Sequence, residues 1–154
     1  MDETKYAYLA GIIDGEGHFQ ASAKSHGQGI RVSVIDEELI AWLHANFPNT
    51  NRYLGGRTKT GNQVYTWFAE RRSVVRELLL SIMPYLVIKR KQAEAMLELH
   101  DHLDNRPRYE IPTTHANQAE RDKRRAARAA HTRRTIELRG AVTALRQRNV
   151  SGVH

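Results

Sequence analysis

Hydrophobic and polar residues change their spacing several times along the first hundred residues of the chain. A helical period comes first and runs into a cluster of glycines; its apolar positions are Tyr6, Leu9, Ile12 and Ile13. From His18 to Lys24 polar and apolar residues alternate, and Ile30 to Val34 repeats this period of two after a glycine-containing turn. The pattern predicts a helix followed by a hairpin with one polar face.

A second helix and a second hairpin follow. The helix is predicted from Asp36 to Phe47, where Pro48 ends it. The strands of the second hairpin are predicted at residues 52–57 and 63–70, and two amphipathic helices at 73–83 and 89–103. The order is helix, two strands, helix, two strands, helix, helix, which indicates an α+β fold.

The last third of the chain has a different composition. Pro107 and Pro112 indicate an irregular connection, and residues 118–134 are rich in alanine and arginine. Leu138, Ala141, Val142 and Leu145 then form a short apolar stripe. We therefore expect two regions, a folded domain over residues 1–112 and a basic, helical C-terminal extension over residues 113–154.

The net positive charge of the chain lies entirely in this extension. The 24 Lys and Arg residues against 17 Asp and Glu give a net charge of +7, yet residues 1–112 hold 14 of each sign. A neutral body with a basic tail indicates a polyanionic partner. Cysteine is absent, which excludes disulfides and thiolate metal sites, and we find no export signal and no apolar run that would span a membrane.

The stretch from Leu9 to Gly17 carries the most specific pattern. Ala7, Gly11 and Gly15 recur every four residues, so on a helix they form a stripe of small side chains. Each glycine costs about 1 kcal/mol relative to alanine inside a helix, and close contact with another helix would compensate this cost. Asp14 and Glu16 lie at the negative end of the helix dipole, where a divalent cation would neutralise them.

This stretch, L-A-G-I-I-D-G-E-G, resembles the signature of the LAGLIDADG homing endonucleases, with Gly15 as the one position that is neither identical nor conservatively changed. The resemblance implies an α+β fold with an αββαββα core, a curved four-stranded antiparallel sheet, C-terminal helices and a basic tail. Because the chain holds one copy of the motif, it also implies a homodimer with Ala7, Gly11 and Gly15 at the contact.

The resemblance further implies an enzyme of mobile introns or inteins that cuts both strands of a long, nearly palindromic DNA site. Its expected cofactor is Mg²⁺, which Mn²⁺ would replace, whereas Ca²⁺ would support binding without cleavage. Glu16 matches the metal ligand and the carbonyl of Gly15 a second ligand, while Asp14 matches a structural acid that bonds local backbone groups. Lys89 matches the lysine of the catalytic pocket. Asp36 matches either a polar active-site residue or simply the N-cap of the next helix.

The polar faces of the two hairpins are the expected DNA-reading surface, because a two-stranded ribbon fits the major groove. On the first hairpin the residues are Gln20, Ser22, Lys24, His26, Gln28, Arg31 and Ser33. On or beside the second they are Arg52, Arg57, Lys59, Gln63, Tyr65 and Trp67. Phosphate contacts are expected from Lys91 and from three arginines of the tail, Arg124, Arg125 and Arg128.

Other functions and roles remain open at this point. An RNA maturase that assists splicing of its host intron would suit the basic tail equally well, and a DNA-binding regulator without nuclease activity would keep the same fold. The presence of both Glu16 and Lys89 argues against that loss of activity. The tail is either a helix that follows phosphates or a solvated segment docked through its apolar stripe. We expect an intracellular protein that acts on DNA and does not bind membranes.

Overall fold

The computed structural model describes residues 2–21, 28–106 and 117–151, with side chains up to Leu145 in the last segment. Its elements are α1 (Glu3–Glu16), β1 (Gly17–Ala21), β2 (Gln28–Val34), α2 (Glu37–Asn46), β3 (Asn51–Arg57), β4 (Gln63–Ala69), α3 (Arg72–Ile82), the 3₁₀ helix η1 (Met83–Tyr85), α4 (Arg90–Asp104) and α5 (Gln118–Ser151). The predicted α+β fold with an αββαββα core is confirmed. Ser22, Lys24 and His26 lie outside the described residues, as does most of the predicted irregular connection.

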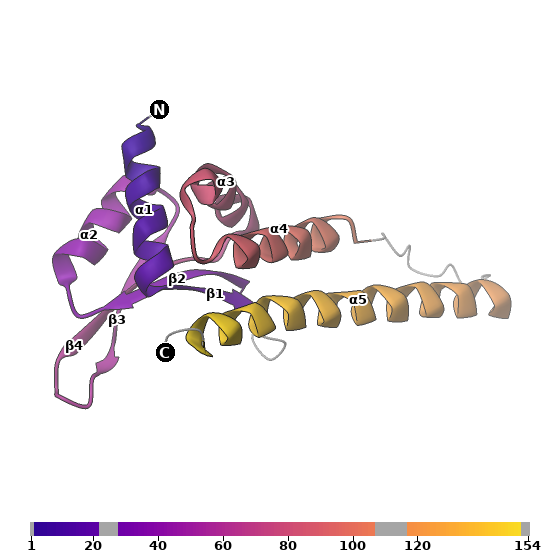
Figure 1. Ribbon diagram of the computed structural model, residues 1–154. Helices are drawn as coiled ribbons and strands as arrows, with labels where there is room; N and C mark the ends of the chain where they lie inside the picture. The colour runs from indigo at the N-terminus through magenta and orange to yellow at the C-terminus, as the bar shows by residue number, and fades with distance from the viewer. Residues whose placement is uncertain (1, 22–27, 107–116, 152–154) are drawn as a thin grey trace.

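The two hairpins form one antiparallel sheet of four strands. The strand order is β1-β2-β4-β3, so β2 and β4 pair at the centre while β1 and β3 form the edges. In the register, Val32 of β2 lies opposite both Gly17 of β1 and Trp67 of β4. Helices α1 to α4 lie together on one side of this sheet (Figure 1).

The hydrophobic core fills the space between the sheet and these helices. Phe19, Val32 and Trp67 enter it from the sheet, and Leu9 and Ile13 from α1, all with 2% exposure or less. Full burial of an apolar side chain of this size contributes about 1.5–3 kcal/mol, so the layer is held mainly by such contacts. One side of α1 is therefore buried in the core.

Side chains and proline set the ends of several helices. Asp2 accepts a hydrogen bond from the Thr4 N–H at 3.2 Å and caps α1, and Asp36 accepts one from the Leu39 N–H at 2.9 Å and caps α2. Pro84 lies within η1, directly after α3. The helix α3 therefore ends before this proline, as the sequence predicted.

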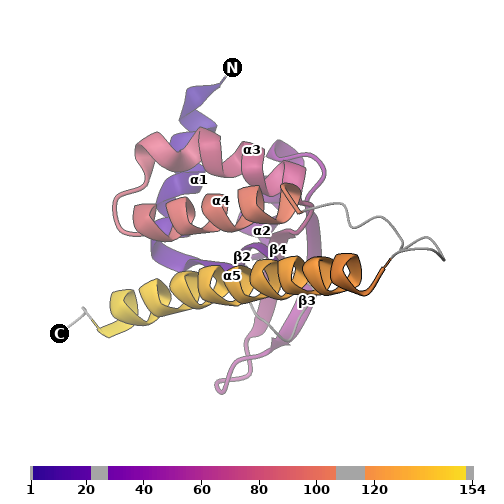
Figure 2. The ribbon, with the colours of Figure 1, turned by 90° about the vertical axis from the view of Figure 1, so that its right-hand side faces the viewer.

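The C-terminal extension is one long helix over the described residues. Helix α5 spans 34 residues, about 50 Å, and runs alongside α4 and across the edge of the sheet at β1 (Figures 1 and 2). Leu138 and Val142 are buried in the core, so the predicted apolar stripe does dock on the body. No described helix is long and apolar enough to cross a membrane.

Candidate active site and nucleic-acid interface

On the outer side of α1, Gly11 and Gly15 have no packing partner among the described residues, whereas the Tyr8 ring meets Trp42 of α2 edge to face at 4.9 Å. Ala7, Gly11 and Gly15 are exposed, and a Cβ added to either glycine would meet no described atom within 4 Å. Tyr8, on the same side, is 52% exposed. Among the described residues, no side chain packs against these two helical glycines to offset their conformational cost.

Gly17 needs its hydrogen side chain for a different reason. A Cβ there would lie 2.7 Å from Ile13 Cα and 2.9 Å from the Ile13 carbonyl oxygen. The chain therefore leaves α1 and enters β1 at once, folded tightly over the last turn of the helix. Glu16, the residue before it, is left exposed at the end of α1.

Asp14 fastens the last turn of α1 to the loop before α4. Its carboxylate accepts hydrogen bonds from the backbone N–H groups of Val87 at 2.7 Å, Ile88 at 3.2 Å and Lys89 at 2.9 Å. The interpretation of Asp14 as a structural acid that bonds backbone groups agrees with this geometry. The expectation that these groups are local is wrong, because they lie 73 to 75 residues away.

The side chain of Lys89 contacts the same end of α1. Its Nζ donates to the carbonyl oxygens of Ile13 at 2.7 Å and Gly17 at 2.6 Å, the two residues on either side of the last helical turn. An ammonium group is favourable there because it faces the negative end of the helix dipole. The fold thus brings Lys89 to the turn that carries Glu16.

Asp36 takes the position of a helix cap. Its carboxylate is engaged with the Leu39 N–H of α2, which is the second of the two roles that the sequence left open. It follows β2 by two residues, at the end of that strand where Gly17 begins β1. A further role at the end of α1 stays a prediction.

The sheet face opposite the helices carries an organised group of side chains. The Arg31 guanidinium donates to the Tyr53 hydroxyl and lies 5.6 Å from the Tyr53 ring and 5.5 Å from the Phe68 ring. The two rings meet edge to face at 5.4 Å. Cation–π contacts of this kind contribute about 0.5–1 kcal/mol at exposed sites and fix the direction of the guanidinium. Neither Tyr53 nor Phe68 was among the predicted interface residues.

The neighbours of Arg31 on this face include two predicted residues, Gln20 and Ser33, and one that was not predicted, His18. His18 lies opposite Arg31 in the register, and Gln20 follows on the same face of β1. Ser33 shares a 2.9 Å hydrogen bond with Thr66 across the strands. The predicted polar face of the first hairpin is therefore present for Gln20, Arg31 and Ser33.

The second hairpin presents a different face from the one predicted. Trp67 is fully buried, and its indole N–H donates to the Thr50 hydroxyl at 2.9 Å. Arg52 lies opposite Trp67, and with Tyr65 it lines a pocket of about 300 Å³ against Glu37 of α2. Burial, followed by the Glu37 carboxylate, raises the pKa of Tyr65. The prediction that Trp67 contacts DNA is wrong, and Arg52 and Tyr65 lie on the helix side of the sheet.

Gln28 also differs from its expected position. It is 8% exposed, and its amide oxygen accepts from Arg139 of α5 at 2.7 and 3.3 Å once the amide is oriented toward that donor. The sequence predicted an exposed, DNA-contacting residue here. The pattern of a hairpin does not show that a helix from far along the chain packs against it. The prediction for Gln28 is corrected accordingly.

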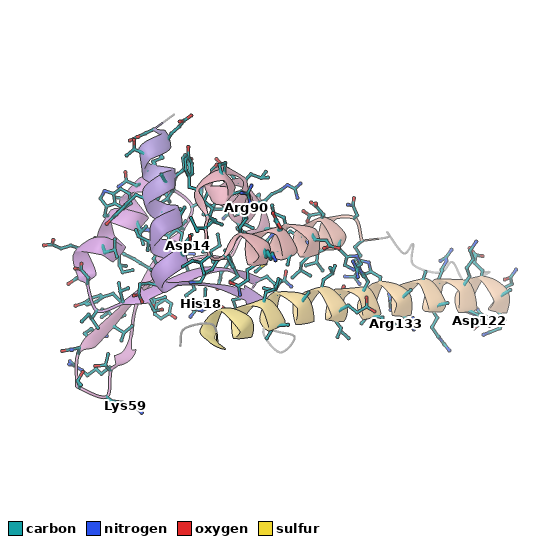
Figure 3. All side chains as sticks on the ribbon, in the orientation of Figure 1. Asp14, His18, Lys59, Arg90, Asp122 and Arg133 are labelled. Carbon is teal, nitrogen blue, oxygen red and sulfur yellow. The ribbon has the colours of Figure 1, made fainter. Side chains whose placement is uncertain are left out.

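The remaining predicted interface residues lie at the periphery. Lys59 is at the tip of the β3–β4 hairpin (Figure 3), where Arg57 bonds the Gly61 carbonyl and the Gln63 amide bonds the Gly55 carbonyl, both at 2.8 Å. Lys91 is exposed near the start of α4. On α5, Arg125 and Arg128 are exposed, and Arg124 pairs with Glu120 at 2.6 Å.

The described residues of one chain hold no cluster of three or more histidine, aspartate or glutamate side chains that could enclose a metal ion. Glu16 and the backbone carbonyls of the last turn are oxygen donors, the type that Mg²⁺ prefers, although the Ile12 and Ile13 carbonyls already accept hydrogen bonds from the Gly17 N–H. The donors that are present therefore fit part of a magnesium site.

No protein-family model matches the chain, and no curated protein matches it by sequence. Solved structures do. The homing endonuclease I-CvuI, determined with DNA and Mg, matches with a TM-score of 0.55 over 96% of both chains at 14% identity. The archaeal intron-encoded homing endonuclease I-Vdi141I, complexed with DNA, also has a TM-score of 0.55 and covers 96% of this chain and 99% of its own, at 10% identity.

A longer protein shows the same unit within a larger chain. The LAGLIDADG meganuclease I-CpaMI, bound to uncleaved DNA, matches 80% of this chain with 49% of its own length, at a TM-score of 0.53 and 12% identity. The likeness of fold extends over 96% of this chain for I-CvuI and I-Vdi141I. This chain thus has the fold of the single-motif LAGLIDADG homing endonucleases.

Proposed function

We propose that this chain is a homodimeric, Mg²⁺-dependent endonuclease that cuts both strands of a long, nearly palindromic DNA site. The observation that carries the proposal is the end of α1. There the exposed Glu16 carboxylate lies in the turn whose flanking carbonyls the Lys89 ammonium contacts, next to two glycines that meet no other described element.

The dimer contact is proposed to extend beyond the glycine stripe. Val87 is 84% exposed and Ile88 60% exposed, and Asp14 holds both of them beside the last turn of α1. Together with Tyr8 they add apolar area around Gly11 and Gly15, which allow close approach of a second helix. A two-fold axis through this surface would place two Glu16 carboxylates close together.

Glu16 and the Gly15 carbonyl would hold the metal, with the second chain supplying the donors that one chain lacks. Bound Mg²⁺ would neutralise charge on the scissile phosphate and provide a nucleophilic water. Lys89 keeps a positive charge at this turn through its two carbonyl contacts, and so stabilises negative charge that develops on the phosphate oxygens. Asp14 acts as a positioning residue because it fixes the backbone of Lys89.

The sheet face opposite the helices is proposed to read the DNA. Arg31 is held in one direction by Tyr53 and Phe68, so little side-chain entropy is lost when it meets a base edge. Arginine makes bidentate contacts with guanine, and Gln20 could make the equivalent contact with adenine. The DNA complexes of I-CvuI and I-Vdi141I support nucleic acid as the partner of this fold.

The proposal is tested with Glu16→Gln on the full chain, using Glu38→Gln in the exposed first turn of α2 as the matched control. Target sites are first selected from a randomised duplex library with Mg²⁺, and binding is then measured with Ca²⁺. We expect Glu16→Gln to bind DNA like the wild type and to lose cleavage at least 1000-fold, while Glu38→Gln cleaves normally. The 1000-fold figure corresponds to about 4 kcal/mol of transition-state stabilisation.

Each other result has a definite meaning. Full cleavage by Glu16→Gln would show that Glu16 is not a metal ligand. Tight, selective binding by the wild type without cleavage in Mg²⁺ would identify a DNA-binding regulator. Binding to intron RNA without selectivity for any duplex would identify a maturase.

A further inference from the structure

Helix α5 has a docked half and a projecting half. The projecting half, from Gln118 to Ala130, extends past the end of α4 in both views (Figures 1 and 2). All of its side chains are exposed except that of Arg124, which is half-buried. Because these described side chains are exposed, the segment gains little hydrophobic stabilisation; its many alanines and arginines favour a helix, and the Gln118–Asp122 and Glu120–Arg124 pairs support it.

The docked half defines which side of α5 meets α4. His102 of α4 stacks on His131 with ring centroids 4.1 Å apart, and its Nε2 lies 3.0 Å from the Thr135 hydroxyl. Leu138 and Val142 follow on the same side and are buried in the core. These four α5 positions are spaced by four, three and four residues, as expected for one side of a helix.

Arg139 defines a second side, the one that meets the sheet. It contacts Gln28, the first residue of β2. Arg128, Arg125 and Arg121 precede Arg139 by 11, 14 and 18 residues, which are about three, four and five turns of an α-helix. The four arginines therefore lie on the same side of α5 over about 27 Å, and we call them the arginine strip.

The acids of α5 lie on other sides of the helix. Glu120, Asp122 and Glu137 are each about 100° or more from Arg139 around the helix axis. Glu120 pairs with Arg124, and Glu137 pairs with Arg134, so the charge of these two acids is directed away from the strip, whereas Asp122 lies three residues before Arg125 and accepts from the Gln118 amide at 2.9 Å. The body of the chain, by contrast, has equal numbers of acids and bases.

We propose that the arginine strip binds backbone phosphates of duplex DNA outside the segment that the sheet reads. The strip begins where α5 crosses the sheet at Gln28 and continues outward beyond the body, so it lengthens the footprint of the protein on the duplex. Guanidinium groups form bidentate hydrogen bonds with phosphates, and such contacts carry no sequence information. This inference rests on the proposed function, because it adds a second contact to the same DNA.

The test compares two double substitutions in the full chain. Arg121→Gln with Arg125→Gln removes two charges from the strip. Lys123→Gln with Arg133→Gln removes two charges from positions about 80° to 160° away from these two arginines around the same helix. Glutamine keeps helix propensity near that of arginine, and circular dichroism verifies that α5 stays folded. Duplex affinity is measured between about 50 and 200 mM salt, with the selected site and with a scrambled duplex.

We expect the strip variant to weaken binding to both duplexes equally and to lower the slope of log K against log salt by about 1.8, since each phosphate contact contributes about 0.9. The control variant should lose less than half as much. Equal losses from both variants would overturn the inference in favour of net charge alone. An unchanged slope in the strip variant would overturn it as well. So would a variant that loses affinity for a hairpin RNA, measured in parallel, but for neither duplex.

Failure of the proposed function is separable from failure of this inference. If the wild type neither selects nor cuts any site, the endonuclease is refuted. The inference still stands if the strip variant loses affinity for the scrambled duplex while the control variant does not.

Discussion

Helices α1 and α5 are built alike in one respect, because each buries one side in the core and leaves another side open. They differ in what the open side contains. On α1 it is uncharged, with space around Gly11 and Gly15 beside the exposed Tyr8, whereas on α5 it is a row of arginines. An uncharged side of small residues permits the close approach of a second protein backbone, while a cationic side favours a polyanion. The composition of the exposed side therefore indicates a second protein chain as the partner of α1 and DNA as the partner of α5.

The two helices are also held to the body by different interactions. The last turn of α1 is fixed by five hydrogen bonds that involve a charged group, three at Asp14 and two at Lys89. Helix α5 is held by the His102–His131 stack, the exposed Arg134–Glu98 pair and two buried apolar side chains. Hydrogen bonds to charged groups contribute more than exposed ion pairs, so we expect α1 to be the more rigid of the two.

The largest expected effect follows from removing the Asp14 carboxylate. Asp14→Ala leaves three backbone N–H groups without their acceptor and should lower the free energy of unfolding by about 3 kcal/mol, measured by urea denaturation. The control is Asp36→Ala, which removes a single helix cap and should cost about 1 kcal/mol. Similar losses from both variants would contradict the special rigidity of α1.

Loss of the dimer is the next largest effect. Gly11→Leu adds a side chain that has open space in its own chain but would enter the proposed partner helix. We expect its dimer dissociation constant to rise at least 100-fold, measured by analytical ultracentrifugation, with loss of cleavage. Gly140→Leu on α5, where an added Cβ also meets nothing, is the matched control and should stay dimeric. A dimeric Gly11→Leu variant would place the contact elsewhere.

Acid should loosen the body through His100, which is fully buried with both ring nitrogens unpaired among the described residues. Burial lowers its pKa below 6.5, although the nearby Asp104 opposes this shift. The folded state therefore binds fewer protons than the unfolded chain, so stability is complete above pH 6.5 and falls, as pH decreases through that value, by up to about 1.4 kcal/mol per pH unit.

The substitution His100→Leu should raise the free energy of unfolding by about 1 kcal/mol at pH 7.5, because an unpaired buried polar group costs about 1–3 kcal/mol. It should also flatten the decline between pH 7.5 and 5.5, followed by urea denaturation at each pH. A decline as steep as that of the wild type would assign the acid sensitivity to another group.

The smallest effect is expected at the joint between α5 and α4. His131→Ala removes the stacked ring and should cost about 1 kcal/mol, the size of an aromatic pair beyond its area of burial. Amide hydrogen exchange should rise along α5 and stay unchanged along α1. If exchange rises equally in both helices, the two are not held independently.

The sequence pattern was sufficient to predict α1, the two hairpins, α2, α3 and α4 and their order. It did not identify the inner face of the second hairpin. Strand β3 is exposed on both sides over most of its length, so polar residues occur on both faces and the alternation loses its meaning. The Trp67 side chain on β4, which a polar-face assignment placed outside, lies in the core.

The candidate site could be predicted only in part. The motif indicated Glu16, and the resemblance indicated Lys89, and the fold brings both to the same turn of α1. The partners of Asp14 had no local signal, because a carboxylate in a sequence does not say which backbone amides it will meet 73 residues later. Tyr53 and Phe68 would have followed from the strand register, which the sequence alone leaves undefined.

The long separation between Asp14 and Lys89 also affects how the protein is made. Both hairpins and α3 lie between the two residues, so these contacts cannot form until residue 89 has left the ribosome. A nascent chain or a fragment that ends before Val87 would carry the entire motif and the entire sheet, yet its Asp14 would have no amides to accept from and its last helical turn no ammonium group. Within one chain, the end of α1 is complete only after nearly 90 residues have been synthesised, which delays any nuclease activity until the domain is whole.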